Sequence, residues 1–223
     1  MTYNNPLNIK VQPWLPLALY IRIFKVQIFQ GDIMNNPKIA IIIGSTRDMR
    51  LGEQVADYLN KVASKRDDMD FDVVDLRDYP LPLFNEIASN AHVPSQNEVA
   101  LKWQSKIDQY DGYIFVTAEY NNSITAALKN ALDYAYPEWN RKPAAMFSYG
   151  SAGGARAVQH LRDICVELQM APVRHSVLIQ GGDFLKLLQG QIKVDDLDYL
   201  EPLTVQMLDQ LSWWATTLKQ GRN

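Results

Sequence analysis

The chain has only one cysteine, Cys165, so an intrachain disulfide framework is excluded. Such low cysteine usage is typical of a reducing compartment, and we expect the protein to work in the cytoplasm. Cys165 lies within the apolar helical pattern VQHLRDICVELQM. This pattern favours a buried packing role over a nucleophilic one.

An excess of positive charge is also missing, because 22 lysines and arginines face 25 aspartates and glutamates, for a net charge of -3. We therefore expect no nucleic-acid partner. The three histidines, His92, His160 and His175, do not cluster in the sequence, so no metal site is predicted. No Gly-x-Ser-x-Gly motif supports a serine hydrolase.

The chain has no long uninterrupted hydrophobic run. The N-terminal stretch WLPLALYIRIFKVQIF is broken by Pro16, Arg22 and Lys25, which makes it too short and too charged for a membrane span. It also lacks the features of a clean signal peptide. We expect residues 1–33 to form an extension outside the core, which arises from an upstream translation start, and residues 34–223 to form the single folded domain.

After Met34, apolar runs of strand length alternate with amphipathic runs of helix length, which predicts a parallel, doubly wound α/β sheet. The predicted strands cover residues 38–44, 71–76, 112–118, 143–150 and 173–179. The predicted helices cover residues 51–65, 95–109, 123–136, 154–169 and 200–219. Ser123 is the expected N-cap of the third helix, and Pro137 is expected to end it. In the last helix we expect Leu203, Met207 and Leu211 to face inward.

The stretch GSTRDMR follows the first predicted strand and has the composition of an anion site. Gly44 permits a tight turn, Ser45 offers a hydroxyl, and the next helix presents unpaired N–H groups. Arg47 and Arg50 add positive charge. The motif is neither a Walker sequence nor a G-x-G-x-x-G fingerprint, so support for ATP hydrolysis and for a Rossmann NAD site is lost. The alternative is an ordinary turn with surface arginines.

Two further loops follow predicted strands. TAEYNNS contains Glu119, Tyr120 and Asn121, whose backbone and side chains can bind the edge of a planar heterocycle. SYGSAGGAR contains three glycines in five residues, which let the backbone approach a flat ring. Taken alone, each loop could be a plain turn, but in a parallel sheet all three lie where one pocket would form.

The stretches GSTRDMRLGEQVA, AEYNNSITAALKNALDYAYPEWNRKPAAMFSYGSAGGARAVQHLR and LQMAPVR closely resemble the NADPH-dependent FMN reductase family. The resemblance runs from about Lys38 to about Gly182, and one departure is Ala118, where many relatives have proline. It implies a flavodoxin-like fold with five parallel strands in the order 2-1-3-4-5 and helices on both faces. It also implies an enzyme that transfers a hydride from NADPH or NADH to FMN and then to a quinone, azo dye, metal oxyanion or free flavin.

The resemblance further implies which residues bind FMN. The first loop, with Ser45, Arg47 and the backbone through Gly52, would hold the phosphate. The isoalloxazine would be lined by Glu119, Tyr120 and Asn121 on one side and by Ser148, Tyr149, Gly150, Ser151 and Gly153 on the other. No catalytic side chain is predicted, because the flavin performs the chemistry.

Two predictions concern partners and class. The stretch YAYPEW places Tyr134, Tyr136 and Trp139 near a helix end, which is typical either of an interface or of a local core cluster. Since relatives form dimers through this region, the resemblance implies a homodimer or homotetramer. The alternative class is a non-enzymatic electron carrier or FMN-binding regulatory partner. Arg47 favours the reductase, because flavodoxins commonly hold the FMN phosphate with hydroxyls and backbone alone.

Overall fold

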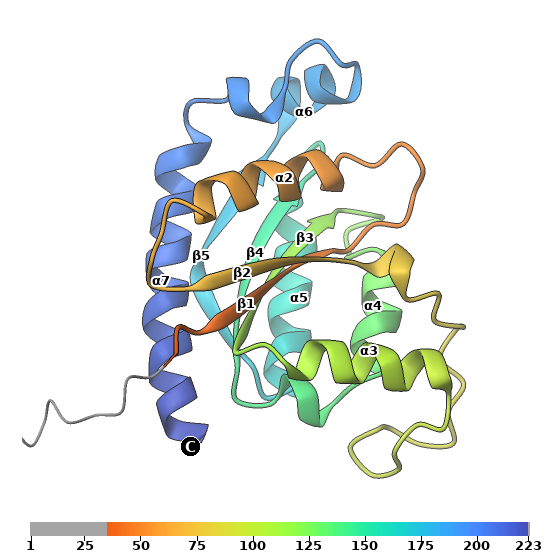
Figure 1. Ribbon diagram of the computed structural model, residues 1–223. Helices are drawn as coiled ribbons and strands as arrows, with labels where there is room; N and C mark the ends of the chain where they lie inside the picture. Colours follow the sequence, from red (N-terminus) through yellow and green to blue (C-terminus); the bar gives the residue numbers. More distant parts are fainter. Residues whose placement is uncertain (1–34, 223) are drawn as a thin grey trace, which may run out of the picture. The chain divides into compact units, whose positions relative to one another are not determined.

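The computed structural model describes residues 35–222, and the prediction for residues 1–33 falls outside this range. Strands and helices alternate along the chain (Figure 1). The elements are β1 (Lys38–Ile43), α2 (Gly52–Ala63), β2 (Asp70–Asp75), η1 (Leu76–Asp78), α3 (Glu98–Asp108), β3 (Gly112–Ala118), α4 (Ala126–Asp133), η2 (Pro137–Trp139), β4 (Pro143–Tyr149), α5 (Ala155–Glu167), β5 (Ala171–Ile179), α6 (Gly181–Leu188), η3 (Val194–Asp196) and α7 (Leu200–Arg222).

The five strands form one parallel sheet in the order β2-β1-β3-β4-β5, which confirms the predicted fold. The strands β1, β3 and β4 are central and are buried along almost their whole length. This is why KIAIII and GYIFVTA read as continuous apolar runs and not as alternating ones.

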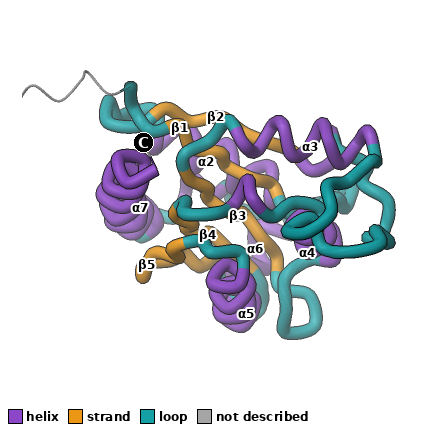
Figure 2. The backbone as a smooth tube through the Cα atoms, turned by 90° about the horizontal axis from the view of Figure 1, so that it is seen from below, coloured by secondary structure: helices purple, strands orange, loops and turns teal. Residues whose placement is uncertain are grey.

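Helices cover both faces of the sheet. Alternate β1 residues point to opposite faces, so Ile39 and Ile41 pack in the cluster under α2 and α7, whereas Ala40 and Ile42 pack in the cluster under α3, α4 and α5. Figure 2 shows α7 on one side of the strands and α3, α4 and α5 on the other. In this arrangement no side of a central strand faces water.

The helix limits differ from the sequence prediction in identifiable ways. The N-cap of α4 is Thr125, whose hydroxyl accepts from the Leu128 N–H, and not Ser123. Ser123 instead pairs with the backbone of Tyr120 across a two-residue turn. The helix ends at Asp133, four residues before Pro137. Helix α6 was not predicted, because FLKLL is short and lies between glycines.

Several predictions about burial can be checked directly. Cys165 is fully buried, as expected, and burial raises the pKa of its thiol to about 12. In α7, Met207 and Leu211 are buried, but Leu203 is 38% exposed, so its predicted inward orientation is wrong. Leu203 lies one position outside the stripe that contacts the sheet.

Two of the three aromatic residues of YAYPEW, Tyr134 and Trp139, lie in the core of the chain, and Tyr136 is partly buried against it. Tyr134 and Trp139 have no exposed surface. The Trp139 ring packs against Trp103, with ring centroids 5.9 Å apart, and against Tyr113 at 4.7 Å. Tyr134 and Trp139 therefore belong to a local core cluster, and they have no exposed surface that could contact another subunit.

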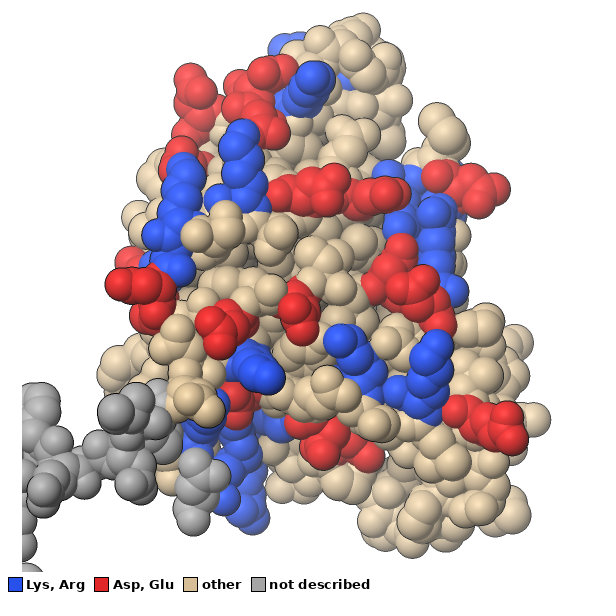
Figure 3. All heavy atoms as spheres, in the orientation of Figure 1, with Lys and Arg blue, Asp and Glu red and all other residues tan. Residues whose placement is uncertain are grey.

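On the face seen in Figure 3, acidic and basic side chains are interspersed, and neither sign of charge gathers in a large patch. Within residues 35–222, no helix is both long and apolar enough to cross a bilayer. The same part of the chain has no group of three or more His, Cys, Asp or Glu side chains placed to hold a metal ion.

Lys142 is a buried cation at the amino end of β4. Its Nζ lies 3.2 Å from the Asp108 carbonyl and 3.2 Å from the Tyr113 hydroxyl, and the side chain is 7% exposed. Burial lowers the pKa of this amine to about 8. The charged form therefore costs the folded state free energy at neutral pH.

We predict that Lys142→Met raises the free energy of unfolding at pH 7 by roughly 1 to 3 kcal/mol. Between the folded pKa of about 8 and the ordinary value of 10.5, the unfolded wild type binds more protons than the folded one. The free energy of unfolding of the wild type therefore rises with pH over this range, and its difference from that of Lys142→Met becomes smaller. Urea unfolding near pH 7 and near pH 10 measures both effects. An advantage that does not change with pH would contradict the prediction, and the exposed Lys129→Met serves as the control.

Candidate functional site

Three loops meet where β1, β3 and β4 end, as the parallel register requires. We call residues 44–51 the first loop, residues 119–125 the second loop and residues 150–154 the third loop. Between them lies a cavity of about 240 Å³, here called the strand-end cleft. Its lining residues are Ser45, Arg47, Met49, Arg50, Leu51, Ala118, Glu119, Tyr120, Tyr149, Gly150, Ser151, Phe184 and Leu188.

Seven of the eleven predicted site residues line this cleft: Ser45, Arg47, Glu119, Tyr120, Tyr149, Gly150 and Ser151. Gly52, Asn121, Ser148 and Gly153 do not. Ser148 is fully buried, and its hydroxyl donates to the Gly153 carbonyl over 2.6 Å. It therefore stabilises the third loop from the protein interior and does not line the cleft. Asn121 is exposed and adopts a positive φ of 51°.

The first loop is rich in free N–H groups. Among the described residues, no N–H from Ser45 through Leu51 donates to another protein group. The Gly52 N–H lies against the Tyr149 hydroxyl, and the Val55 N–H donates to the Leu51 carbonyl. These groups lead into α2, whose N-terminus carries a partial positive charge. Consecutive free N–H groups of this kind form a concave anion site.

Arg50 braces the first loop from inside the protein. Its side chain is 2% exposed and makes a two-pronged ion pair with Asp75 at the end of β2. The same guanidinium donates to the Ser45 carbonyl over 2.9 Å. Although burial opposes it, the hydrogen bonds from Arg50 and from the Arg77 N–H lower the pKa of Asp75 below its ordinary value. The carboxylate therefore stays ionised at neutral pH.

Arg47 is exposed on the first loop, unlike Arg50. Its guanidinium lies 5.8 Å from the centroid of the Tyr120 ring, which is a cation–π distance. The Tyr120 hydroxyl lies 3.2 Å from the Ser45 hydroxyl. The first and second loops are thus joined by side chains that also line the strand-end cleft.

The second loop is a tight turn followed by a cap. Asn121 and Asn122 have φ values of 51° and 69°, and the Tyr120 and Ser123 backbones exchange hydrogen bonds across them. Asparagine tolerates this left-handed conformation better than most residues, which explains the Asn-Asn pair. Thr125 then donates its hydroxyl to the Gly44 carbonyl and so ties the second loop to the first.

Glu119 organises the third loop rather than standing free in the cleft. Its carboxylate pairs with Arg156 and accepts from the Arg156 N–H over 3.1 Å, within the first turn of α5. The carboxylate thus supplies the cap that Gly154 lacks. Gly154 itself has a φ of 75°, and an added Cβ would lie 2.7 Å from the Ser148 Oγ. Only glycine fits this close approach.

Helix α6 closes the cleft with apolar side chains that the sequence prediction missed. Phe184 stacks with Tyr149 at a centroid distance of 6.3 Å, and Leu188 is 54% exposed beside them. The Tyr149 side chain is nearly buried, and burial raises the pKa of its hydroxyl. The available signal was the apolar cluster FLKLL directly after the last strand.

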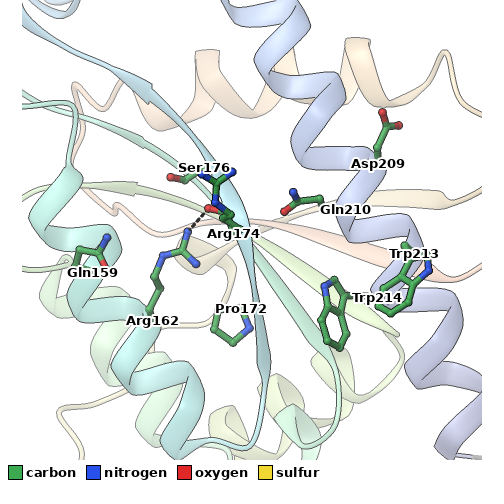
Figure 4. A pocket seen from close by; sticks show the side chains of 9 residues that line it. All are labelled: Gln159, Arg162, Pro172, Arg174, Ser176, Asp209, Gln210, Trp213 and Trp214. Atoms are coloured by element: carbon green, nitrogen blue, oxygen red, sulfur yellow. Dashed lines mark hydrogen bonds between the residues drawn. The ribbon is translucent and has the colours of Figure 1, made fainter.

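A larger groove of about 900 Å³ lies elsewhere, on the free edge of β5 between α5 and α7 (Figure 4). Arg162 crosses it and donates to the Val173 and Arg174 carbonyls, and Gln210 accepts from the His175 N–H. These side chains satisfy backbone groups of an edge strand and so protect it from pairing with another strand. The groove lies along the edge of the sheet, away from the three loops.

The fold defines a flavodoxin-like protein, and its strand-end cleft lies between a loop with unpaired N–H groups and the apolar side chains of α6. The model of the NADPH-dependent FMN reductase family matches residues 37–183, and the chain belongs to this family. It is an oxidoreductase that depends on FMN and NAD(P)H, as the sequence predicted.

Three relatives illustrate the match. The chain is 38% identical over 146 residues to the NAD(P)H-dependent FMN reductase ntnL of Nectria sp, with 61% of this chain and 73% of that protein covered. It is 30% identical over 197 residues to the NAD(P)H-dependent FMN reductase LOT6 of Saccharomyces cerevisiae, with 83% and 99% covered. It is 36% identical over 140 residues to a 2-hydroxy-1,4-benzoquinone reductase of Burkholderia sp, with 60% and 72% covered.

Among solved structures, the flavoenzyme NAD(P)H:(acceptor) oxidoreductase FerB of Paracoccus denitrificans superposes with a TM-score of 0.55 at 24% identity. The superposition covers 77% of this chain and 98% of FerB. This similarity concerns the fold, and it agrees with the flavodoxin-like strand order.

We predict that Glu119→Ala lowers the free energy of unfolding by about 1 to 2 kcal/mol, because α5 loses its cap. Arg156→Ala should cost less than about 1 kcal/mol, since the Arg156 side chain is 56% exposed and its ion pair is screened by water. Urea unfolding of both variants tests this. Equal losses would show that the ion pair, and not the cap, is the stabilising contact.

Proposed function

We propose that the strand-end cleft binds FMN, with the phosphate at the first loop and the isoalloxazine between the second and third loops. The observation that carries the proposal is the run of free N–H groups from Ser45 to Leu51, directly before α2. A phosphate monoester accepts several such bonds at once and gains from the helix dipole. Arg47, exposed at the rim, adds a charge-assisted bond.

The remaining residues fit the rest of the cofactor. Gly150 presents bare backbone at the cleft wall, and the room that it leaves would be filled by a Cβ in ordinary contact with Glu119 and Gly154 at 3.5 Å. Tyr120, Tyr149 and Phe184 supply aromatic surface for a flat ring. Ser45 is 2% exposed and lies at the junction of the anion site and this slot.

Bound FMN supplies the hydride chemistry, so this chain needs to bind, orient and shield the reacting partners. The Glu119 carboxylate is held by Arg156 and by the N–H groups of α5, so we assign it a structural role in the cleft. Leu188 and Met49 leave apolar surface exposed at the cleft. We propose that these two side chains exclude water and contact NAD(P)H. The oxidised nicotinamide would then leave the cleft before the acceptor enters.

We propose a quinone as the acceptor. The relative from Burkholderia is named a 2-hydroxy-1,4-benzoquinone reductase, and a planar, weakly polar quinone suits the apolar side formed by α6. Azo dyes, metal oxyanions and free flavin are the other acceptors for a screen. A non-enzymatic electron carrier is the competing function, and it would bind FMN without consuming NADPH.

We also propose that the protein is a cytoplasmic homodimer or homotetramer that works on small molecules. Its one buried cysteine suits a reducing compartment. Since Tyr134 and Trp139 are used inside the core, an interface needs other residues, and Trp213, 61% exposed on α7, is the largest apolar side chain available among the described residues. Light scattering measures the mass, and a monomer would overturn this proposal.

The decisive experiment follows the visible absorbance of the FMN-loaded protein under anaerobic conditions when NADPH is added. We expect the flavin absorbance to bleach and to return when a benzoquinone is injected. An unchanged oxidised spectrum would favour the carrier function. No bound flavin at excess FMN would overturn the cofactor site itself.

For Arg47→Ala we expect a loss of FMN binding free energy of about 1.5 to 3 kcal/mol, because one charge-assisted contact to the phosphate is removed. Fluorescence titration with FMN measures the dissociation constant. Arg141→Ala, at a surface position outside the cleft, is the control and should bind FMN as the wild type does. Equal affinities of Arg47→Ala and wild type would remove Arg47 from the site.

A further inference from the structure

Three consecutive carbonyl groups of the first loop are held by two arginines. Arg50 donates to the Ser45 carbonyl over 2.9 Å. Arg77 donates to the Arg47 carbonyl and, over a longer distance of 3.4 Å, to the Thr46 carbonyl. Arg50 belongs to the first loop itself, and its buried side chain folds back on the loop, whereas Arg77 reaches the loop from η1.

These contacts fix the direction of the N–H groups as well. In a trans peptide the C=O of one residue and the N–H of the next point in opposite directions, and the described chain contains no cis peptide. When the carbonyls of residues 45, 46 and 47 face the arginines, the N–H groups of residues 46, 47 and 48 must face away from them. None of these three N–H groups has a partner in the described chain.

Asp75 connects the two arginines. Its carboxylate accepts from both Nη atoms of Arg50 and, over 3.0 Å, from the Arg77 N–H. Asp75 is the last residue of β2, an edge strand, and neither Asp75 nor Arg77 lines the strand-end cleft. Of the three residues, only Arg50 borders the cleft, and Asp75 and Arg77 act on the loop from outside the space that a ligand would fill.

We propose that Arg50, Asp75 and Arg77 are positioning residues that preset the first loop for the FMN phosphate, and so determine the preference for FMN over riboflavin. The inference rests on the proposed function, which places the phosphate at this loop. A loop whose carbonyl groups are already held, and whose N–H groups are therefore already turned away from the arginines, does not have to order itself on binding, so the phosphate gains its hydrogen bonds without that entropic cost. Riboflavin has no phosphate and gains nothing from the preset loop.

The test compares the dissociation constants of FMN and riboflavin for each protein by fluorescence titration. In Asp75→Asn the charge that holds Arg50 is lost, and we expect FMN affinity to fall by about tenfold while riboflavin affinity stays within about twofold. Asp70→Asn is the matched control. It changes an exposed carboxylate at the other end of the same strand, and it should leave both constants unchanged.

A second variant separates loop geometry from simple charge attraction. Arg50→Lys keeps the positive charge, but an ammonium lacks the planar fork with which the guanidinium binds the Asp75 carboxylate while it also donates to the Ser45 carbonyl. We expect Arg50→Lys to lose FMN selectivity as Asp75→Asn does. Retained selectivity would mean that charge alone matters and would overturn the positioning role of Arg50.

Riboflavin binding and the melting temperature also show whether a variant folds. A misfolded protein loses both ligands, and Asp75→Glu, which keeps the charge, then provides the folded comparison and should recover part of the selectivity. If the wild type itself does not distinguish FMN from riboflavin, the proposed phosphate site fails. If the wild type does and Asp75→Asn keeps the same ratio of constants, the present inference alone is wrong.

Discussion

The parallel pairing of β1, β3 and β4 is the constraint on which the rest of this structure depends. Parallel strands end at the same edge, so residues 44–51, 119–125 and 150–154 meet although about a hundred residues separate the first loop from the third. The pairing in turn requires both faces to be covered, which the helices achieve. The strand-end cleft lies at the edge of the sheet that these helices leave uncovered.

Polar contacts then hold the three loops to one another and to the scaffold. Thr125 joins the second loop to the first through the Gly44 carbonyl, and Glu119 joins the second loop to the start of α5. Asp75 braces the first loop through Arg50. Each of these groups satisfies backbone atoms that would otherwise be left unpaired near the end of the sheet, where burial makes an unpaired group costly.

This arrangement separates the groups that shape the site from the groups that are left for a ligand. Two acidic side chains near the cleft, Asp75 and Glu119, are both committed to arginines. The unsatisfied groups around the cleft include N–H donors of the first loop and the buried Nε of Arg50. A site with committed carboxylates and free N–H groups attracts an anion, and this agrees with a protein that leaves redox chemistry to FMN.

The sequence alone determined the sheet, its parallel character and the positions of the three loops, because continuous apolar runs and helical periodicity are local signals. The position of the three loops after strands predicted a shared pocket, and the resemblance to the reductase family then named seven of the residues that line the cleft. The tertiary structure decided the rest. The pairing of Arg50 with Asp75, the capping of α5 by Glu119 and the closure by α6 join residues that are distant in sequence. No local pattern specifies such pairs, because their geometry exists only once the strands are aligned and the helices packed.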